Sequence, residues 1–299
     1  MRGKGRSASA TCIMTAMYDP RYTRAFYDAY GVAEWSRLEA TAYGRLQAII
    51  HTDFLERYVR SGYRVLDAGC GPGRFSVIIA GLGGRVTVLD ISKTQLDLAR
   101  ARLAEAKLLA NVEGFLEGDI VDLSMLPDGH FDLVVCYGGA LSYVCERRET
   151  AAAQLVRVTR PGGVLLVSVM SRFGVAANAV RSPLYPFTVV KDPEGALLFR
   201  IIREGDLSGL PSTKVQGQHA PMHLYSAEEL QALFTNCEML ELAGSNVSTF
   251  EGSSYFEELA ADPEAWVTEV EVERALNHVP GLVDSGSHII LAARRPASG

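Results

Sequence analysis

Apolar positions from residue 63 onward alternate between two spacings. Short runs rich in β-branched residues fit strands, and between them the apolar residues recur at helical spacing. The predicted strands are Tyr63–Asp67, Arg85–Asp90, Val112–Leu116, Phe131–Cys136 and Val164–Val169, and the predicted helices are Pro72–Ala80, a helix capped by Ser92 and Gln95, and Arg147–Thr159. Strands that are apolar on both faces and alternate with helices predict an α/β fold with a doubly wound, mostly parallel sheet.

Two segments interrupt this alternation. We predict a cap insertion over residues 171–222 and a mostly helical insertion over residues 245–287. The other predicted elements of this half are a hairpin of Thr188–Lys191 with Ala196–Arg203, a helix from Ser226, and strands at Glu238–Leu242 and His288–Ala293. The last two strands bring the expected sheet to seven.

The residues before the sheet predict a helical lid. Helices over Arg21–Tyr30 and Glu34–Arg60 would pack over the ligand-binding edge of the sheet. We expect the lid to span residues 15–62, after a basic, disordered extension over 1–14. The sheet domain, with both insertions, would then span residues 63–299.

Composition narrows the class of protein. The 299 residues are 48% hydrophobic, enough for a full core, and no apolar run approaches the roughly 18 residues that a membrane-spanning helix needs. A net charge of −6 without a basic cluster makes nucleic acid an unexpected partner. The five cysteines show neither disulfide nor metal-ligand spacing, so we expect a cytoplasmic protein with no metal site. The sequence leaves a homodimer open.

A glycine-rich loop follows the first predicted strand. Ligands of open parallel sheets bind beyond the carboxyl ends of the strands, where the strand order reverses. Glycines at 69, 71 and 73 permit a sharp turn and a close approach of the backbone to a ligand. Dinucleotide enzymes share such loops, so the loop alone does not identify the ligand.

Three neighbouring residues narrow the class of ligand that this loop could bind. Arg74 stands where a dinucleotide motif needs glycine or alanine. Asp67 places a carboxylate just before the first glycine, which would repel a pyrophosphate and suit a cationic ligand. Asp90 ends the second strand at the spacing where an acidic side chain binds ribose hydroxyls. Together they favour a nucleoside without a pyrophosphate.

Several motifs in order resemble those of class I S-adenosylmethionine-dependent methyltransferases. The resemblance covers residues 63–170 and rests on Val65–Gly73, Val86–Ser92, Leu116–Ile120, Phe131–Tyr137 and Arg160–Val164. It implies a Rossmann-like fold and S-adenosylmethionine as the cofactor.

The resemblance also implies roles for single residues. Gly69, Cys70 and Gly71 would line the methionine part, supported by Asp67, with Cys136 and Tyr137 closing that side. Asp90 would hold the ribose and Ile91 would lie beside the adenine. Asp119 would accept from the adenine amino group and Ile120 would donate from its main chain, while Gln95 stands where the family often stacks an apolar residue on the adenine.

Further candidates come from the residues outside these motifs. Tyr27 belongs to an aromatic cluster that either packs the lid helices or covers the ligands. Arg45 is a candidate partner for the methionine carboxylate, although most helical arginines face water. His219 and His223 are candidate general bases, with helix capping as the alternative for His223, and Tyr143 is a candidate wall residue near the reacting atoms.

The expected activity is transfer of a methyl group to oxygen or nitrogen of a small-molecule metabolite or natural product. The fourth strand is followed by Tyr137-Gly138-Gly139-Ala140, which differs from the motif of enzymes that methylate nucleobase amino groups. Two alternatives stay open: a nucleotide-binding oxidoreductase and a non-catalytic S-adenosylmethionine-binding protein. A base is needed only if the acceptor must lose a proton.

Overall fold

A computed structural model describes residues 17–181, 196–208 and 219–297. The expected extension over residues 1–14 and the expected strand Thr188–Lys191 lie outside the described residues. Within the described part, no helix combines the length and the apolar composition needed to cross a membrane.

The strands and helices follow the order of the chain. The strands are β1 (Arg64–Ala68), β2 (Arg85–Asp90), β3 (Val112–Glu117), β4 (Phe131–Cys136), β5 (Thr159–Met170), β6 (Asp206–Leu207), β7 (Met222–His223), β8 (Glu238–Ser245) and β9 (His288–Arg294). The helices are α1 (Pro20–Tyr30), α2 (Ala33–Arg37), α3 (Ala42–Tyr58), α4 (Arg74–Gly81), α5 (Lys93–Glu105), α6 (Ala140–Tyr143), α7 (Arg148–Val158), α8 (Arg172–Arg181), α10 (Ala196–Glu204), α11 (Ala227–Ala232), α12 (Ser254–Leu259) and α13 (Pro263–Leu276), with short 3₁₀ turns at Leu109–Asn111, Cys145–Arg147 and Val283–Ser285.

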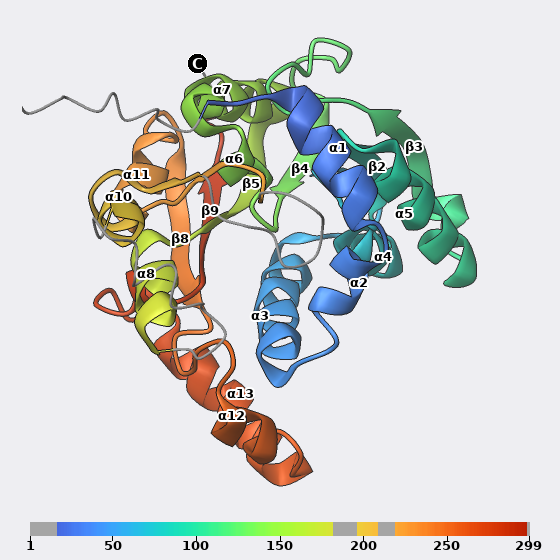
Figure 1. Ribbon diagram of the computed structural model, residues 1–299. Coiled ribbons are helices and arrows are strands. Elements are labelled where there is room, and N and C mark those ends of the chain that lie inside the picture. The colour runs from blue at the N-terminus through green and yellow to red at the C-terminus, as the bar shows by residue number, and fades with distance from the viewer. Residues whose placement is uncertain (1–16, 182–195, 209–218, 298–299) are drawn as a thin grey trace, which may run out of the picture.

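A seven-stranded sheet in the order β3-β2-β1-β4-β5-β9-β8 forms the centre of the molecule (Figure 1). Strands β1 to β5 all run parallel to one another, and β9 runs antiparallel between β5 and β8. The predicted doubly wound, mostly parallel sheet is therefore confirmed. The strand order reverses between β1 and β4, which is the position where open sheets of this kind bind ligands.

Alternating side chains of the strands build a core on each face of the sheet. In β1, Val65 packs with apolar residues of α3, α4 and α5, including Leu46, whereas Leu66 packs on the opposite face with α7, including Leu155. This two-residue period is what strands covered on both faces require. A third, smaller cluster joins α8, α10, β6 and β7.

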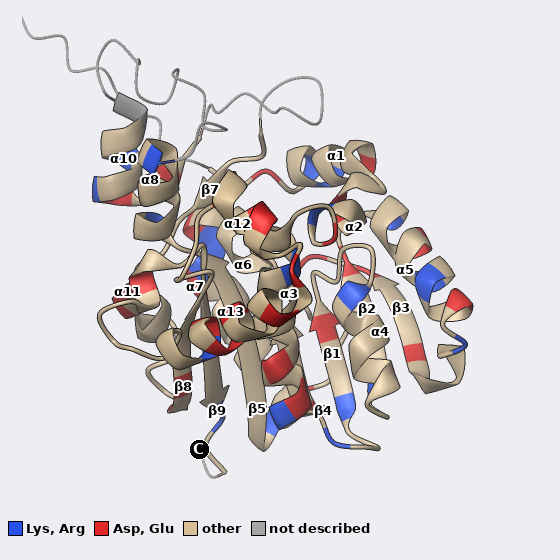
Figure 2. Cartoon of the chain, turned by 90° about the horizontal axis from the view of Figure 1, so that it is seen from below, with Lys and Arg blue, Asp and Glu red and all other residues tan. Residues whose placement is uncertain are grey.

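Helices from two distant parts of the chain meet at one end of the sheet. The lid helices α1 and α2 and the cap helices α8 and α10 lie beyond the end at which β1 terminates (Figure 2). Helices α12 and α13, at the orange and red end of the colour bar, lie beside α3 (Figure 1), and their residues Phe256 and Val270 belong to the core on one face of the sheet. The ligand-binding edge is thus covered by the lid and cap helices.

The expected strand Ala196–Arg203 is wrong, because this segment forms helix α10. Leu198 and Ile201, three residues apart, pack against the cap cluster, whereas Phe199 and Ile202 are exposed. That spacing puts the buried pair on one helical face, which an alternating strand could not do. The cap does contain a two-stranded ribbon, but β6 and β7 form it.

Two local expectations about helices also need correction. The predicted helix Glu34–Arg60 is interrupted, since α2 ends at Arg37 and Thr41 caps the start of α3 by accepting from the Gly44 amide at 3.0 Å. Ser92 caps α5 as expected, accepting from the Gln95 amide at 3.2 Å. The Gln95 side chain does not complete a capping box, because it bonds to the lid.

Candidate active site

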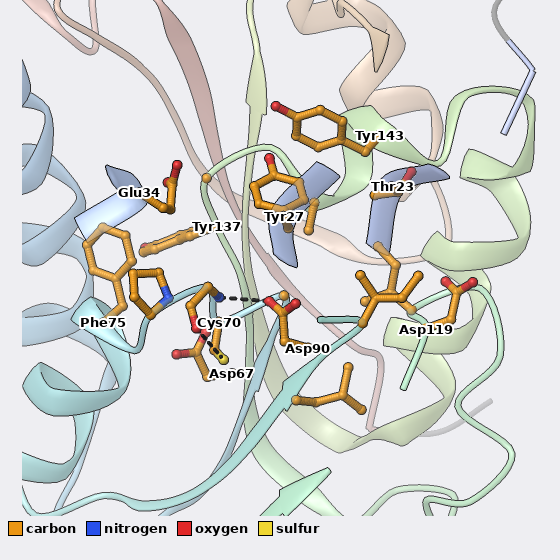
Figure 3. Close-up of a pocket in the computed structure, with 18 of the residues that line it drawn as sticks. Thr23, Tyr27, Glu34, Asp67, Cys70, Phe75, Asp90, Asp119, Tyr137 and Tyr143 are labelled. Atoms are coloured by element: carbon orange, nitrogen blue, oxygen red, sulfur yellow. Dashed lines mark hydrogen bonds between the residues drawn. The ribbon is translucent and has the colours of Figure 1, made fainter. Parts of the chain in front are cut away.

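A cavity of about 910 Å³ opens at the carboxyl ends of β1, β2, β3 and β4. Its walls come from the lid, the glycine loop and the segments that follow β2, β3 and β4, namely Tyr18, Thr23, Tyr27, Glu34, Arg37, Leu38, Asp67, Gly69, Cys70, Gly71, Pro72, Arg74, Phe75, Leu89, Asp90, Ile91, Gly118, Asp119, Ile120, Tyr137, Gly138, Ala140, Tyr143 and Val144. Asp119 lies at one end of the cavity, and Glu34 and Phe75 lie at the other (Figure 3). The carboxyl ends of the strands, near the point where the strand order reverses, are the usual place for a ligand site in an open parallel sheet.

The floor of the cavity depends on glycine. Gly69 has φ +78°, and a β-carbon there would lie 2.5 Å from the β-carbon of Ala140. Gly73 has φ +84°, and a β-carbon there would lie 2.8 Å from the α-carbon of Ala99. Both positions therefore require glycine for conformation and for space.

Two buried carboxylates lie beneath the loop. Asp90 accepts from the amides of Gly71 and Ser92, each at 2.8 Å, and burial raises its pKa to about 6. Asp67 accepts from the Ser76 hydroxyl at 2.5 Å, and burial raises its pKa to about 7, with a smaller contribution from the charge of Asp90. A cation bound above this pair would offset the cost of burying two negative charges.

The other end of the cavity is closed by the start of the lid. The Tyr18 hydroxyl donates to Asp119 Oδ2 at 2.7 Å, and burial together with this hydrogen bond raises the pKa of Tyr18 well above its usual range. The Tyr18 amide donates to Glu146 at 2.8 Å, and Asp119 Oδ1 accepts from the Val121 amide at 2.9 Å. Tyr18 therefore occupies one oxygen of the carboxylate that was expected to bind an adenine amino group.

Polar contacts hold α1 against β2 and α5. Arg24 Nε donates to the Ile91 carbonyl at 3.0 Å, and Asp28 accepts from the Ser92 hydroxyl at 2.6 Å. The amide of Gln95, which is buried, donates to the carbonyls of Tyr27 at 2.9 Å and Gly31 at 3.1 Å. Gln95 therefore anchors the lid and does not line the cavity.

A charged pair from α2 borders the glycine loop. Arg37 donates to Glu34 Oε1 through Nε at 3.1 Å and through Nη2 at 2.8 Å. Arg74 closes the same side by donating to the Trp35 carbonyl at 2.9 Å, and its guanidinium stacks over the Trp35 ring. Opposite charges at one end of a cavity suit the ammonium and carboxylate of an amino acid.

Most of the expected site residues meet in this cavity. Those that line it are Asp67, Gly69, Cys70, Gly71, Asp90, Ile91, Asp119, Ile120, Tyr137, Tyr27 and Tyr143. Five others do not line it: Gln95, Cys136, Arg45, His219 and His223. Tyr18, a member of the same aromatic cluster as Tyr27, also lines the cavity. The sequence analysis missed Thr23, Glu34, Arg37 and Phe75, although the spacing of Glu34 and Arg37 signals a helical ion pair.

The positions of Cys136 and Arg45 outside the cavity have clear structural causes. Cys136 is the last residue of β4 and its side chain is fully buried in the core, so Tyr137 is the first residue of that strand end to reach the cavity. Arg45 lies in the first turn of α3, beyond the break in the lid, where its guanidinium lies over the Trp266 ring. Arg37, which lies before the break, lines the cavity where Arg45 does not.

The two candidate bases lie behind the cavity wall. His219 stacks on Tyr143, with ring centroids 6.0 Å apart, and its Nδ1 lies 2.9 Å from the Ala220 carbonyl. His223 is buried in β7, 3.9 Å from a Glu229 oxygen, and burial lowers its pKa to about 4. Across residues 17–181, 196–208 and 219–297, no group of three or more His, Cys, Asp or Glu side chains could hold a metal ion.

Comparison with known proteins identifies the family. Residues 65–163 match the family described as "Methyltransferase domain". A ubiquinone/menaquinone biosynthesis C-methyltransferase from Psychromonas ingrahamii is 30% identical over 209 residues, which is 66% of this chain and 76% of the relative. The chain belongs to the class I S-adenosylmethionine-dependent methyltransferases. A malonyl-[acyl-carrier protein] O-methyltransferase from Serratia marcescens is 41% identical over 110 residues, which is 37% of this chain and only 39% of the relative.

Solved structures of the same fold differ widely in sequence. The [4+2]-cyclase SpnF superposes with a TM-score of 0.61 at 20% identity, covering 95% of this methyltransferase and 98% of that chain. An S-adenosylmethionine-dependent methyltransferase from Methanosarcina mazei gives a TM-score of 0.54 at 18% identity, covering 81% and 97%. Because one of these is named a cyclase, the fold alone does not define a reaction, and the family assignment rests on the sequence match.

The cavity fits S-adenosylmethionine, the cofactor of this family. It offers the carboxylate Asp90 beside the glycine loop, the apolar side chains of Ile91 and Ile120, and an ionic pair at one end. When bound, the cofactor supplies an electrophilic methyl group on a positively charged sulfur. The buried pair of Asp67 and Asp90 favours that charge.

Proposed function

We propose that this methyltransferase transfers the methyl group to an oxygen or nitrogen atom of a small-molecule metabolite or natural product. The observation that carries the proposal is the cavity bordered by the lid, with Tyr27 and Tyr143 among its lining residues. A cavity of this kind suits a small acceptor, because its walls can hold the acceptor in line with the methyl group. The net charge of −6 disfavours nucleic acid as the acceptor.

The proposed cofactor contacts follow from the positions of the side chains. Asp90 accepts from the ribose hydroxyls, and Asp119 accepts from the adenine amino group once Tyr18 has moved. Ile91 and Ile120 pack beside the adenine. At the opposite end, Glu34 binds the ammonium group and Arg37 the carboxylate of the methionine part, as their place beside the glycine loop supports.

The relatives do not agree on the acceptor atom. The Serratia marcescens relative is named for O-methylation and the Psychromonas ingrahamii relative for C-methylation. The chain spans less than half of the length of the first of these, so its acceptor does not carry over. We favour oxygen or nitrogen because the two tyrosine hydroxyls are hydrogen-bonding partners for a polar acceptor atom.

Calorimetric titration with S-adenosylhomocysteine and with a nicotinamide dinucleotide tests the cofactor side of the proposal. We expect only S-adenosylhomocysteine to bind. Incubation with S-adenosylmethionine carrying a labelled methyl group and a panel of small hydroxyl, carboxyl and amino compounds tests the acceptor side. The label should appear in an ether, an ester or an amine, whereas labelled nucleic acid, or label in no compound of the panel, would contradict the proposal.

A further inference from the structure

Helix α2 contains no buried residue and no side chain that caps its start. Gly31, two residues before it, has φ +51°, a conformation that favours glycine. Leu38, directly after it, is buried and anchors the C-terminal end. Within the helix, the one large apolar side chain is that of Trp35, which is half-buried. The contacts of Trp35 are therefore what hold the body of α2 in place.

Two arginines from other helices hold Trp35. The guanidinium carbon of Arg74, the first residue of α4, lies 4.3 Å from the centroid of the indole ring, and that of Arg102, in the last turn of α5, lies 4.5 Å from it. Indole is the strongest aromatic partner for such a cation. Arg74 Nη2 also donates to the Trp35 carbonyl at 2.9 Å. The two arginines thus attach α2 to the helices that follow β1 and β2.

Helix α2 carries a charged pair of the cavity wall. Glu34 and Arg37 both line the cavity, and Arg37 Nη2 lies 2.8 Å from Glu34 Oε1. A β-carbon at Gly71 would lie 3.8 Å from Glu34 Cγ, so α2 lies directly against the glycine loop. Glu34 is at the end of the cavity that also holds Phe75 (Figure 3). The position of α2 therefore decides where an amino acid at this end meets its charged partners.

We propose that Trp35 and Arg102 are positioning residues for the cofactor. Their stacking contact fixes α2 so that Glu34 and Arg37 reach the ammonium and carboxylate groups of the methionine part. This inference rests on the proposed function, which assigns those two groups to Glu34 and Arg37. Neither Trp35 nor Arg102 lines the cavity, so both act through α2.

Arg102 isolates the contribution of the stacking contact. Its charge also forms an exposed ion pair with Glu105 at 3.0 Å, of a kind that contributes little to stability. Arg74, by contrast, lines the cavity and bonds to the main chain of Trp35, so a substitution there would combine several effects. Arg102 is therefore the residue to change.

Arg100 is the matched control for Arg102. It lies on the same helix, and its guanidinium carbon lies 4.0 Å from the centroid of the Phe115 ring of β3. Neither Arg100 nor Phe115 lines the cavity. Arg100 thus has the same charge and the same kind of stacking contact, but on a strand of the sheet and not on the lid.

Loss of the stacking contact should affect one part of the cofactor only. Without it, α2 shifts from the glycine loop, and Glu34 and Arg37 lose their places beside the methionine part. The nucleoside part keeps Asp90 and Ile91, which lie at the end of β2 and do not belong to α2. A ligand with an amino acid part should therefore bind more weakly, whereas a ligand without one should not.

Calorimetry on the full-length protein tests the inference with S-adenosylhomocysteine and with methylthioadenosine, which has no amino acid part. Arg102→Gln should weaken the binding of S-adenosylhomocysteine about fivefold, the usual size of one cation–π contact, and that of methylthioadenosine less than about twofold. Arg102→Lys, which keeps a cation near the ring, should restore most of the affinity. Arg100→Gln should leave both affinities unchanged.

Fluorine NMR shows whether the indole ring itself moves. The chain has two tryptophans, so protein labelled with 5-fluorotryptophan gives one signal for Trp35 and one for Trp266, which Trp266→Phe assigns. Arg102→Gln should shift the Trp35 signal. The signal of Trp266, on α13, should stay in place and show that the fold is intact. Arg100→Gln should shift neither signal.

The other outcomes overturn the inference. An equal loss of affinity for both ligands would make Arg102 a residue of the general fold, and an equal loss in Arg100→Gln would make the effect one of charge on α5. Unchanged affinity for S-adenosylhomocysteine in Arg102→Gln would show that the stacking contact does not position the charged pair.

The native protein separates these failures from failure of the proposed function. If it binds S-adenosylhomocysteine and Arg102→Gln has no effect, only the positioning role is wrong. If it binds no S-adenosylhomocysteine, the proposed function fails, and this inference fails with it.

Discussion

The two ends of the cavity are built in different ways. The cofactor end comes from short segments at the carboxyl ends of parallel strands: Asp67 to Gly71 at the end of β1, Asp90 and Ile91 at the end of β2, and Asp119 and Ile120 just after β3. The acceptor end comes from α1, α2, α6 and the segment before β7, which lie far apart in the sequence. The sheet thus dictates where the cofactor binds, whereas the packing of distant helices dictates where the acceptor binds.

The largest effect should come from the cofactor end. Asp90→Asn removes the negative charge expected to bind the ribose and should weaken S-adenosylhomocysteine binding by about 2 to 3 kcal/mol, as for a hydrogen bond to a charged group. Calorimetry measures this, with Asp97→Asn on the exposed face of α5 as the control. Unchanged affinity in Asp90→Asn would contradict the assignment of this carboxylate to the ribose.

Arg37→Gln should cause the next largest loss of cofactor affinity, and the size of this loss should depend on which ligand is tested. Loss of a charged hydrogen-bond donor to the methionine carboxylate should cost about 1.5 to 3 kcal/mol in the affinity for S-adenosylhomocysteine. Methylthioadenosine, which lacks the amino acid part, should bind the variant and the native protein alike. Arg45→Gln, on the far side of the lid break, is the matched control. An equal loss for both ligands would assign Arg37 to the fold of the lid.

These two arginines show what the sequence could and could not predict. The positions of Asp67, Asp90 and Asp119 in the cavity were predictable because each lies at or just after the end of a strand whose apolar pattern marks that end. Arg37 was not, because the break between α2 and α3 depends on the Thr41 cap and on packing that the pattern over residues 34–60 does not display. With a single predicted helix over residues 34–60, Arg45 was the candidate partner for the methionine carboxylate, and Arg37 was not considered.

Other predicted site residues lie outside the cavity lining for the same reason, which is packing between distant parts of the chain. Gln95 occupies the expected position on α5, but the lid carbonyls of Tyr27 and Gly31 take its amide, and they lie more than 60 residues away in the chain. His219 and His223 were predicted from their chemistry alone, whereas the packing of His219 against Tyr143 and the position of His223 in β7 place both outside the cavity lining. Local pattern predicts the elements, while long-range packing decides which side chains reach the cavity.

Acid should weaken cofactor binding by an amount set by Asp90. Its pKa is about 6 in the free protein, so the carboxylate is ionised above that pH and protonated below it. Because ribose hydroxyls donate to the ionised form, affinity should be constant above about pH 7 and fall by up to about tenfold for each pH unit below 6. Calorimetry from pH 5 to 8 checks this. The Asp90→Asn variant should lose that slope, and an unchanged slope would place the titrating group elsewhere.

The smallest expected change in cofactor affinity comes from a residue at the start of the lid. Tyr18→Phe removes the hydroxyl that donates to Asp119, so the adenine amino group would no longer compete with it. We expect S-adenosylhomocysteine to bind up to about 1 kcal/mol more tightly, the usual net value of one hydrogen bond. Tyr255→Phe, on the exposed surface of α12, is the control. Weaker binding by Tyr18→Phe would mean that Tyr18 contacts the cofactor directly.

Helix α1 links the two ends despite their different construction. Tyr18, just before the helix, bonds to Asp119 at the cofactor end, and Tyr27, near its other end, borders the acceptor end. The eleven residues of α1 form one continuous helix, so an outward movement of the whole helix would uncover both ends of the cavity at once. Spent cofactor and methylated product would then leave through the same opening, and each catalytic cycle would include one opening and one closing of α1.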